Sequence, residues 1–296
     1  MPLPFAKMHG LGNTYIYLDL TGGPDPDSLD LPELSRRVSD VHFGIGSDGL
    51  IAILPSSAAD FRMRMFNADG SEAEMCGNGI RCVGKYVYDS GLTSKTDLVI
   101  ETGAGLRRLE LHPEGGAVRR VRVDMGPPKL SRGEIPMAGD PLSRALEAPL
   151  DIDGERFYVT AVSMGNPHCV IFVDEITDRL VREVGPKIER HPAFPRRTNV
   201  EFAKVREDGI LEMRVWERGS GETMACGTGA CAVGVAAALL GRAPGKSTVR
   251  LLGGDLDVEW QPGGTVYMTG PAVLVCRGEL SDEWLEQSLP GRVENR

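Results

Sequence analysis

Short runs of alternating apolar and polar residues recur along most of the chain. They include residues 61–65, 120–123 and 213–215, and each is bounded by glycine, proline or aspartate residues that are typical of turns. Such alternation predicts strands with one buried face. Helical patterns are fewer and fall at residues 32–39, 77–89, 176–183, 227–240 and 282–288. The pattern therefore predicts an α+β fold, rich in strands, with one prominent helix in each half.

The two halves of the chain match each other when residues 63–92 are laid on residues 213–242 without a gap. Nine positions are then identical: Met63, Arg64, Glu72, Cys76, Gly77, Gly79, Val83, Gly84 and Gly91 fall on Met213, Arg214, Glu222, Cys226, Gly227, Gly229, Val233, Gly234 and Gly241. Chance rarely produces so many identities in so short an alignment, so the pattern indicates an internal duplication. It predicts two similarly folded domains that pack about a pseudo-two-fold axis and face each other.

Each half carries the sequence Cys-Gly-x-Gly immediately before a helical pattern, at Cys76 and at Cys226. A thiol in this place lies at a helix N-terminus, where backbone N–H groups and the helix dipole favour an anion. We therefore expect both thiols to form thiolates more readily than a free cysteine does. The same N–H groups, flanked by glycines, are also suited to bind a carboxylate.

Two such thiols around one cleft suit the inversion of an amino acid at its α-carbon. One thiolate removes the proton from one face while one thiol supplies a proton to the other, and the N–H groups stabilise the charge on the carboxylate. This chemistry needs no cofactor. A redox pair of thiols is the main alternative, although such enzymes usually place both cysteines close in sequence. The other four cysteines, Cys82, Cys169, Cys231 and Cys276, are expected to be buried as small apolar side chains.

Composition narrows the classes of function further. The chain has 296 residues, 41% hydrophobic and 25% charged, which is typical of a globular protein with two domains. A net charge of −9 argues against a nucleic-acid partner and against a basic membrane-binding surface. The N-terminus lacks the pattern of a secretion signal, and the longest apolar run, 230–240, is too short to cross a membrane, so a cytoplasmic location is expected. Six cysteines without a CxxC pair and five histidines without metal-ligand spacing predict free thiols and no metal site.

Several longer motifs resemble those of the diaminopimelate epimerase family over nearly the whole chain. They are KMHGLGN at 7–13, FNADGSE at 66–72, MCGNGIRC at 75–82, SMGNPHC at 163–169, RTNV at 197–200 and ERGSGET at 217–223. The resemblance implies an isomerase that epimerises LL-2,6-diaminopimelate to meso-diaminopimelate for lysine and peptidoglycan synthesis, without a cofactor and as a homodimer. It also implies two pseudo-symmetric domains, each a strongly bent sheet or barrel wrapped around a central helix. The first comprises residues 1–126 and 271–296 with Cys76, and the second comprises 127–270 with Cys226.

The resemblance also assigns roles to single residues. It implies that Cys76 and Cys226 are the catalytic acid and base, and that His168 and Glu217 adjust their pKa values. The reacting carboxylate is expected at the N–H groups of Gly77, Asn78, Gly227 and Thr228. The distal amino-acid group is expected at Asn13, Asn67, Asn166, Asn199, Glu217 and Arg218. Arg218 suits a carboxylate and Glu217 an ammonium group, whereas each asparagine, taken singly, is equally consistent with a turn residue that bonds only to backbone.

Gly49 departs from the pattern of the family, because many members carry at this position a glutamine that is counted as a substrate contact. A glycine cannot supply that contact. The alternative among enzymes is a proline or hydroxyproline racemase, but proline has no second charged end for Glu217 and Arg218 to bind. A binding protein that has lost catalysis is disfavoured because both cysteines are present. Two reactive thiols in one cleft also predict oxidative inactivation through a disulfide between Cys76 and Cys226.

Overall fold

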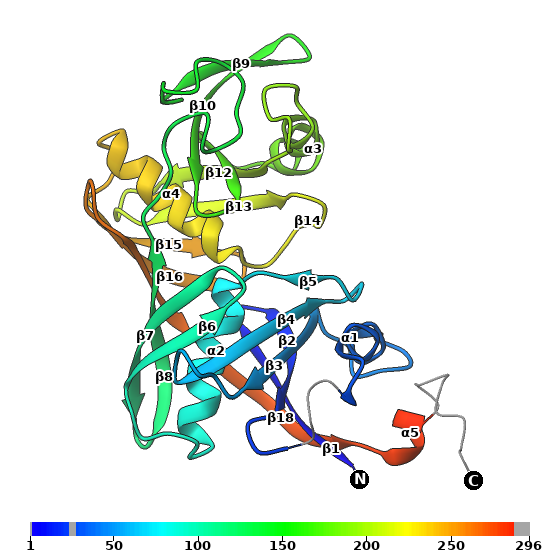
Figure 1. Ribbon diagram of the computed structural model, residues 1–296. Coiled ribbons are helices and arrows are strands. Elements are labelled where there is room, and N and C mark those ends of the chain that lie inside the picture. The colour runs from blue at the N-terminus through cyan, green and yellow to red at the C-terminus, as the bar shows by residue number, and fades with distance from the viewer. Residues whose placement is uncertain (1, 24–27, 287–296) are drawn as a thin grey trace. The chain divides into compact units, whose positions relative to one another are not determined.

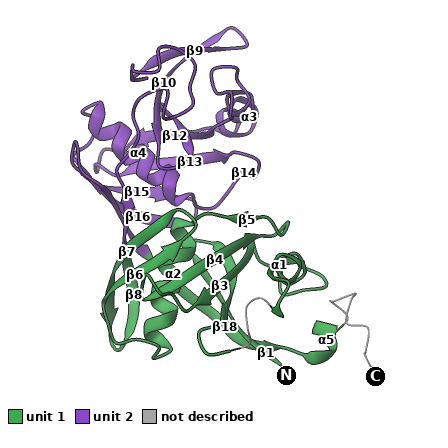
Figure 2. Cartoon of the chain, viewed as in Figure 1, with its two compact units in different colours: residues 1–121, 271–296 green, residues 122–270 purple. Residues whose placement is uncertain are grey.

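The computed structural model describes residues 2–23 and 28–286, and Figure 1 shows its helices and strands. The chain forms two compact units, Met1–Val121 with Pro271–Arg296 and Arg122–Gly270 (Figure 2). Strand β8 (Ala117–Gly126) carries the chain from the first unit into the second, and the chain returns to the first unit at Pro271.

The first unit is built on one mixed sheet. Its other elements are β1 (Leu3–Gly10), β2 (Asn13–Asp19), α1 (Leu31–Ser39), β3 (Gly49–Leu54), β4 (Phe61–Asn67), β5 (Glu72–Ala73), α2 (Gly77–Asp89), β6 (Asp97–Thr102), β7 (Gly105–Glu114), β18 (Val273–Leu280) and α5 (Asp282–Glu286). The strands pair in the order β18–β1–β2–β3–β4–β6–β7, and the short β5 also pairs with β4. Only β2–β3 and β4–β6 are parallel among these pairs, and α1 and α2 supply the crossovers that parallel pairs need.

The second unit repeats this plan. Its elements are β9 (Ala148–Ile152), β10 (Glu155–Ser163), β11 (Pro167–Phe172), the π-helix η2 (Leu180–Val184), α3 (Gly185–Glu189), β12 (Asn199–Val205), β13 (Leu211–Glu217), β14 (Gly221–Glu222), α4 (Gly227–Leu239), β15 (Lys246–Leu251), β16 (Gly254–Trp260) and β17 (Val266–Pro271). The order is β9–β10–β11–β12–β13–β15–β16–β17, with β14 on β13, and the parallel pairs are β11–β12 and β13–β15. The same order and the same crossovers in both units confirm the internal repeat.

Each sheet bends around the helix that follows its cysteine. Helix α4 packs against β10, β11, β12, β13, β15 and β16, and α2 packs against β1, β2 and β7. In each unit, a glycine at the equivalent helix position lets the helix approach the sheet closely. A Cβ on Gly84 would lie 2.8 Å from a methyl group of Leu111, and one on Gly234 would lie 2.7 Å from a methyl group of Val258. The duplicated glycines therefore mark where helix and sheet touch.

A second helix covers the opposite face of the sheet in the first unit. Leu31, Leu34 and Val38 of α1 pack in one buried cluster with Leu50 and Phe66 of the sheet. Because the sheet is covered on both faces, every residue of β3 is buried, which is why the run from Gly49 to Leu54 is apolar throughout instead of alternating.

The repeated arginines brace the hairpins that lead to the cysteines. Arg64 binds Glu72 through two hydrogen bonds of 2.8 and 2.9 Å, and Arg214 binds Glu222 at 2.7 Å. Each pair joins the strand before the turn to the short strand after it. Partly exposed ion pairs of this kind contribute about 0–1 kcal/mol each, so their main effect is on local geometry.

The predicted helices are found, with one shift in position. Helices α1, α2 and α4 begin and end within a residue of the expected ranges. The helix expected at 176–183 instead runs as η2 and α3 to Glu189. Pro186 lies in the first turn of α3, where its missing N–H is tolerated, so the helical segment continues past residue 183. Helix α5 covers 282–286, and the remaining expected residues, 287–288, lie outside the described part of the chain.

Three of the four other cysteines are buried as expected. Cys82, Cys169 and Cys231 are fully buried, whereas Cys276 is exposed. The prediction for Cys276 was wrong because β18 leaves five consecutive side chains, from Val273 to Arg277, exposed. Within the described residues, no helix is long and apolar enough to cross a membrane.

Candidate active site

Cys76 forms the N-terminal cap of α2. Its backbone is extended (φ −131°, ψ 117°), and its Sγ accepts a hydrogen bond from the N–H of Gly79 at 3.3 Å. An N-cap side chain satisfies one of the N–H groups that the first turn of a helix leaves open. The sulfur therefore occupies the position where serine or aspartate usually caps a helix, next to the positive end of the dipole.

Cys226 has the same geometry in the second unit. Its backbone is extended (φ −115°, ψ 108°), and its Sγ accepts from the N–H of Gly229 at 3.4 Å. The residue is 6% exposed, whereas Cys76 is partly exposed. Helices α2 and α4 thus both begin with a sulfur cap and a glycine-rich first turn. Local geometry of this kind is set by the Cys-Gly-x-Gly sequence itself.

Polar side chains from β2 and the loop before β3 surround Cys76. Asn13 Oδ1 lies 3.4 Å from Cys76 Sγ and accepts from Asn78 Nδ2 at 3.4 Å, while Asn13 Nδ2 donates to Asp48 at 2.9 Å. Tyr15 is 4% exposed and lies close to the side chains of Cys76 and Asn13. Burial, followed by the negative charge of Cys76, raises the pKa of Tyr15, so this phenol stays protonated. Asn13, Asn78 and Cys76 thus form one hydrogen-bonded group.

Asn67 and Gly49 lie opposite each other on β4 and β3. The Asn67 amide donates to Ser71 Oγ at 3.0 Å within a turn. Gly49 has a φ of +154°, and a Cβ there would overlap the carbonyl oxygen of Phe66 and lie 2.9 Å from the ring of Tyr15. A glutamine at position 49 therefore needs a different backbone from the one this chain adopts. The structure thus has no room for a side chain at position 49.

A chain of hydrogen bonds reaches Cys226 from the interior of the second unit. Thr228 Oγ1 lies 3.5 Å from Cys226 Sγ and accepts from Asn166 Nδ2 at 3.3 Å. Asn166 Oδ1 lies 3.0 Å from His168 Nε2, and His168 Nδ1 lies 2.7 Å from Glu201 Oε1. The side chains of His168 and Glu201 are fully buried. His168 is thus linked to Cys226 through the side chains of Asn166 and Thr228.

Glu217 lies beside Cys226 at the end of β13. Its carboxylate accepts a hydrogen bond from the Thr223 hydroxyl and interacts with the Cys226 side chain. Burial raises the pKa of Glu217, and the Thr223 hydrogen bond opposes that shift. Burial also raises the pKa of Cys226 well above the ordinary thiol value, and the carboxylates of Glu217 and Glu201 raise it further. The expectation of a readily formed thiolate is therefore wrong for Cys226.

The sizes of the two competing effects, the helix dipole and burial, explain why the pKa of Cys226 is raised and not lowered. A helix N-terminus stabilises an anion by about 0.3–1 kcal/mol, and by up to ~2 kcal/mol in partly buried sites. Full burial of a charged group shifts its pKa by up to about 3–5 units, or roughly 4–7 kcal/mol. With two carboxylates nearby, burial outweighs the dipole at Cys226. Burial and the two carboxylates thus favour the thiol form of Cys226.

Asn199 and Arg218 are held mainly by backbone groups. Asn199 is buried, donates to the carbonyl of Pro167 at 2.9 Å, and accepts from the N–H of Arg218 at 2.9 Å. The exposed Arg218 donates to the carbonyl of Arg196 at 3.2 Å. Asn199 thus fixes the backbone that carries Arg218.

Sequence reasoning missed Glu201, Tyr15 and Asp48. Glu201 lies in an apolar stretch of β12, where a carboxylate has no local reason to be buried. The repeat offered a signal, because residue 201 matches Ile51 in the other half, and a charge in place of an apolar core residue is a conspicuous difference.

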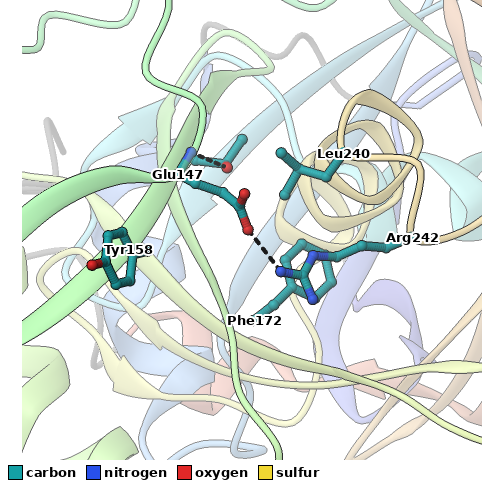
Figure 3. Close-up of a pocket in the computed structure, with 6 residues that line it drawn as sticks. Glu147, Tyr158, Phe172, Leu240 and Arg242 are labelled. Carbon is teal, nitrogen blue, oxygen red and sulfur yellow. Dashed lines mark hydrogen bonds and ion pairs between the residues drawn. The ribbon is translucent and has the colours of Figure 1, made fainter.

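A surface cavity of about 410 Å³ lies elsewhere in the second unit. Arg242 pairs with Glu147 at 2.7 Å. Figure 3 shows this pair together with Phe172, Tyr158 and Leu240, which also line the cavity. None of the predicted site residues lines it. All six cysteines are free thiols, and a disulfide between Cys76 and Cys226 remains a prediction.

Comparison with protein families gives one match that covers most of the chain. The family model described as diaminopimelate epimerase matches residues 5–131 and 160–275. The diaminopimelate epimerase of Moorella thermoacetica is 57% identical over 277 residues, which cover 93% of this chain and 98% of the relative. That of Methanococcus maripaludis is 51% identical and covers 94% and 99%.

Solved structures that resemble the fold are more distant in sequence. A hydroxyproline epimerase from Agrobacterium vitis aligns with a TM-score of 0.70 at 18% identity and covers 94% of this chain and 92% of that one. A phenazine biosynthesis protein from Bacillus anthracis aligns with a TM-score of 0.69 at 18% identity and covers 95% and 99%. These likenesses support a fold dominated by strongly bent sheets. Together with the near-complete sequence match, they establish that the chain belongs to the diaminopimelate epimerase family.

Proposed function

We propose that this protein epimerises LL-2,6-diaminopimelate to meso-diaminopimelate, a step towards lysine and peptidoglycan, with Cys76 and Cys226 as the acid–base pair and without a cofactor. One observation carries the proposal. In both units a cysteine caps the helix that crosses between parallel strands, and in both its sulfur accepts the N–H three residues later. A buried structural cysteine has no reason to recur in this polar setting. Membership of the diaminopimelate epimerase family indicates diaminopimelate as the substrate.

The helix ends supply the electrostatic part of the mechanism. Removal of the α-proton places negative charge on the neighbouring carboxylate. The first turn of each helix carries N–H groups that no carbonyl of the same helix accepts. We assign the backbone of Gly77, Asn78, Gly227 and Thr228 to this carboxylate, because preorganised donors stabilise the developing charge without reorganisation.

The two sulfurs take different roles at rest. Because burial and two carboxylates raise the pKa of Cys226, it begins as the thiol and donates its proton to the α-carbon. Cys76, which is more exposed than Cys226, takes the part of the base. The roles exchange in the reverse direction.

The distal amino-acid group is assigned to the polar residues around the two cysteines. Arg218 binds its carboxylate and Glu217 its ammonium group, while Asn13, Asn67 and Asn166 supply amide contacts. Asn199 contributes by holding the Arg218 backbone. A second charged end is absent from proline, so this clamp favours diaminopimelate over a racemase substrate.

The test is incubation of the reduced protein with LL-diaminopimelate in D₂O without added cofactor, followed by NMR. We expect meso product that carries deuterium at the inverted carbon, since a two-base enzyme delivers a solvent-derived proton. Absence of exchange with diaminopimelate, together with exchange of proline or hydroxyproline, would transfer the assignment to a racemase. Loss of activity on adding a chelator or a carbonyl reagent would contradict the cofactor-free mechanism.

We also propose that the protein is a homodimer in a reducing compartment such as the cytoplasm. Val273, Leu274 and Val275 are three consecutive exposed apolar residues on β18, and contiguous apolar surface marks contact sites. Free thiols at both catalytic positions require reducing conditions. Light scattering should give twice the mass of one chain, and Leu274→Glu should lower that mass to the monomer value. A monomeric wild-type protein would contradict the proposal.

A further inference from the structure

Glu201 is the buried end of the hydrogen-bond chain that leads to Cys226. It projects from β12, which pairs with β11 and β13. A carboxylate only accepts hydrogen bonds, so His168 Nδ1 carries the hydrogen in the 2.7 Å contact. From there the chain continues through Asn166 and Thr228 to the sulfur. The side chain that anchors His168 is therefore fixed by the sheet.

The carboxylate also lies close to the sulfur itself. A Cβ on Gly229 would lie 2.9 Å from Glu201 Oε1 and 3.2 Å from Cys226 Sγ. The two atoms are therefore no more than about 6 Å apart, within the range at which like charges oppose ionisation. The other oxygen, Oε2, is buried without a hydrogen-bond partner in the described structure. A buried carboxylate that is only partly satisfied destabilises a fold, so it calls for a functional reason.

The first unit provides an internal comparison. Glu201 and Ile51 occupy equivalent places, because Val200 pairs with Trp216 just as Leu50 pairs with Phe66. Each side chain points at the third residue after the cysteine: Ile51 Cδ1 lies 2.6 Å from a Cβ placed on Gly79. The same position beside the helix end thus holds a methyl group at Cys76 and a carboxylate at Cys226. The scaffold alone does not need the charge.

We propose that Glu201 is a positioning residue that makes the two cysteines unequal: it holds Cys226 in the thiol form and orients His168, so that Cys226 is the acid of the resting pair. This inference rests on the proposed epimerisation and adds to it the residue that assigns the roles. The ionisable groups that face Glu201 are His168 and Cys169 on β11, Glu217 on β13 and Cys226 on α4.

The experiment measures the ionisation of each thiol separately. Wild-type protein and Glu201→Gln are alkylated with iodoacetamide over a range of pH, and the Cys76 and Cys226 peptides are quantified by mass spectrometry. Glutamine keeps the volume and an oxygen that accepts from His168, but removes the charge. We expect Cys226 in Glu201→Gln to react about tenfold faster at neutral pH, equivalent to a pKa lower by about one unit, while Cys76 is unchanged.

Activity gives a second readout that a purely structural role would not change. In Glu201→Gln, the basic limb of the pH profile moves to lower pH, because the Cys226 thiol ionises earlier. Glu207→Gln, a substitution of an exposed carboxylate in the same unit, is the matched control and should leave both thiols and the profile unchanged.

Several outcomes would overturn the inference. Unchanged or slower alkylation of Cys226 in folded Glu201→Gln contradicts it, as does an equal shift at Cys76. If Glu201→Gln does not fold, the wild-type protein still decides, because Cys226 must require a higher pH than Cys76 for alkylation. Alkylation does not depend on turnover, so failure here is distinct from failure of the epimerase assay.

Discussion

Replacement of either Cys76 or Cys226 by alanine is expected to lower kcat/KM for epimerisation by at least about 10³-fold. Each sulfur moves one proton, and a positioned acid or base contributes about 10²–10⁴-fold to a rate. The two act as one unit, so the double variant should be scarcely slower than either single variant. The measurement is the initial rate of meso product from LL-diaminopimelate.

The same variants separate proton exchange from inversion. With one sulfur left, the remaining base can remove an α-proton and return a deuteron to the same face. Each single variant should therefore exchange the α-proton of one isomer in D₂O without forming product. Cys276→Ser is the matched control, because this exposed cysteine lies outside the site. Inversion at more than a tenth of the wild-type rate in either alanine variant would remove that cysteine from the mechanism.

A second large effect is expected from alanine at Gly229, and a smaller one from alanine at Gly79. Both glycines donate their N–H to the capping sulfur, and both substitutions gain similar intrinsic helix propensity. Their surroundings differ. The new Cβ at 229 meets Glu201 Oε1 at 2.9 Å and Cys226 Sγ at 3.2 Å, whereas at 79 it meets the flexible end of Ile51 at 2.6 Å. A methyl group can turn aside, but a carboxylate held by His168 cannot.

We therefore expect Gly229→Ala to lower kcat/KM by about 10²-fold, because displacement of a catalytic group by a fraction of an ångström has effects of this order. Gly79→Ala should lower it by less than about tenfold. Steady-state kinetics and thermal unfolding of both variants provide the comparison. Equal losses in the two variants would show that the contacts around Glu201 have no special importance.

The fold was largely predictable because its signals are local or repeated. The alternation at residues 61–65 predicts a strand regardless of its partners, and the Cys-Gly-x-Gly sequence predicts a helix start at each cysteine. The duplicated residues pointed to the same plan in both halves, which the strand order confirms. The helix expected at 176–183 was placed too early, because its continuation to Glu189 includes Pro186 in a first turn, where proline is tolerated.

The sequence by itself determined the repeated plan, the two capping cysteines and the family. These depend on periodicity and on turns of a few residues, which any chain with this sequence must form. Only the tertiary structure decided three features: the raised pKa of Cys226, the hydrogen bond by which Asn199 holds the Arg218 backbone, and the position of Glu201 beside His168. The reason is that burial and like charges act through space: the pairing of β11 with β12 brings His168 and Glu201 together although they are 33 residues apart in the chain.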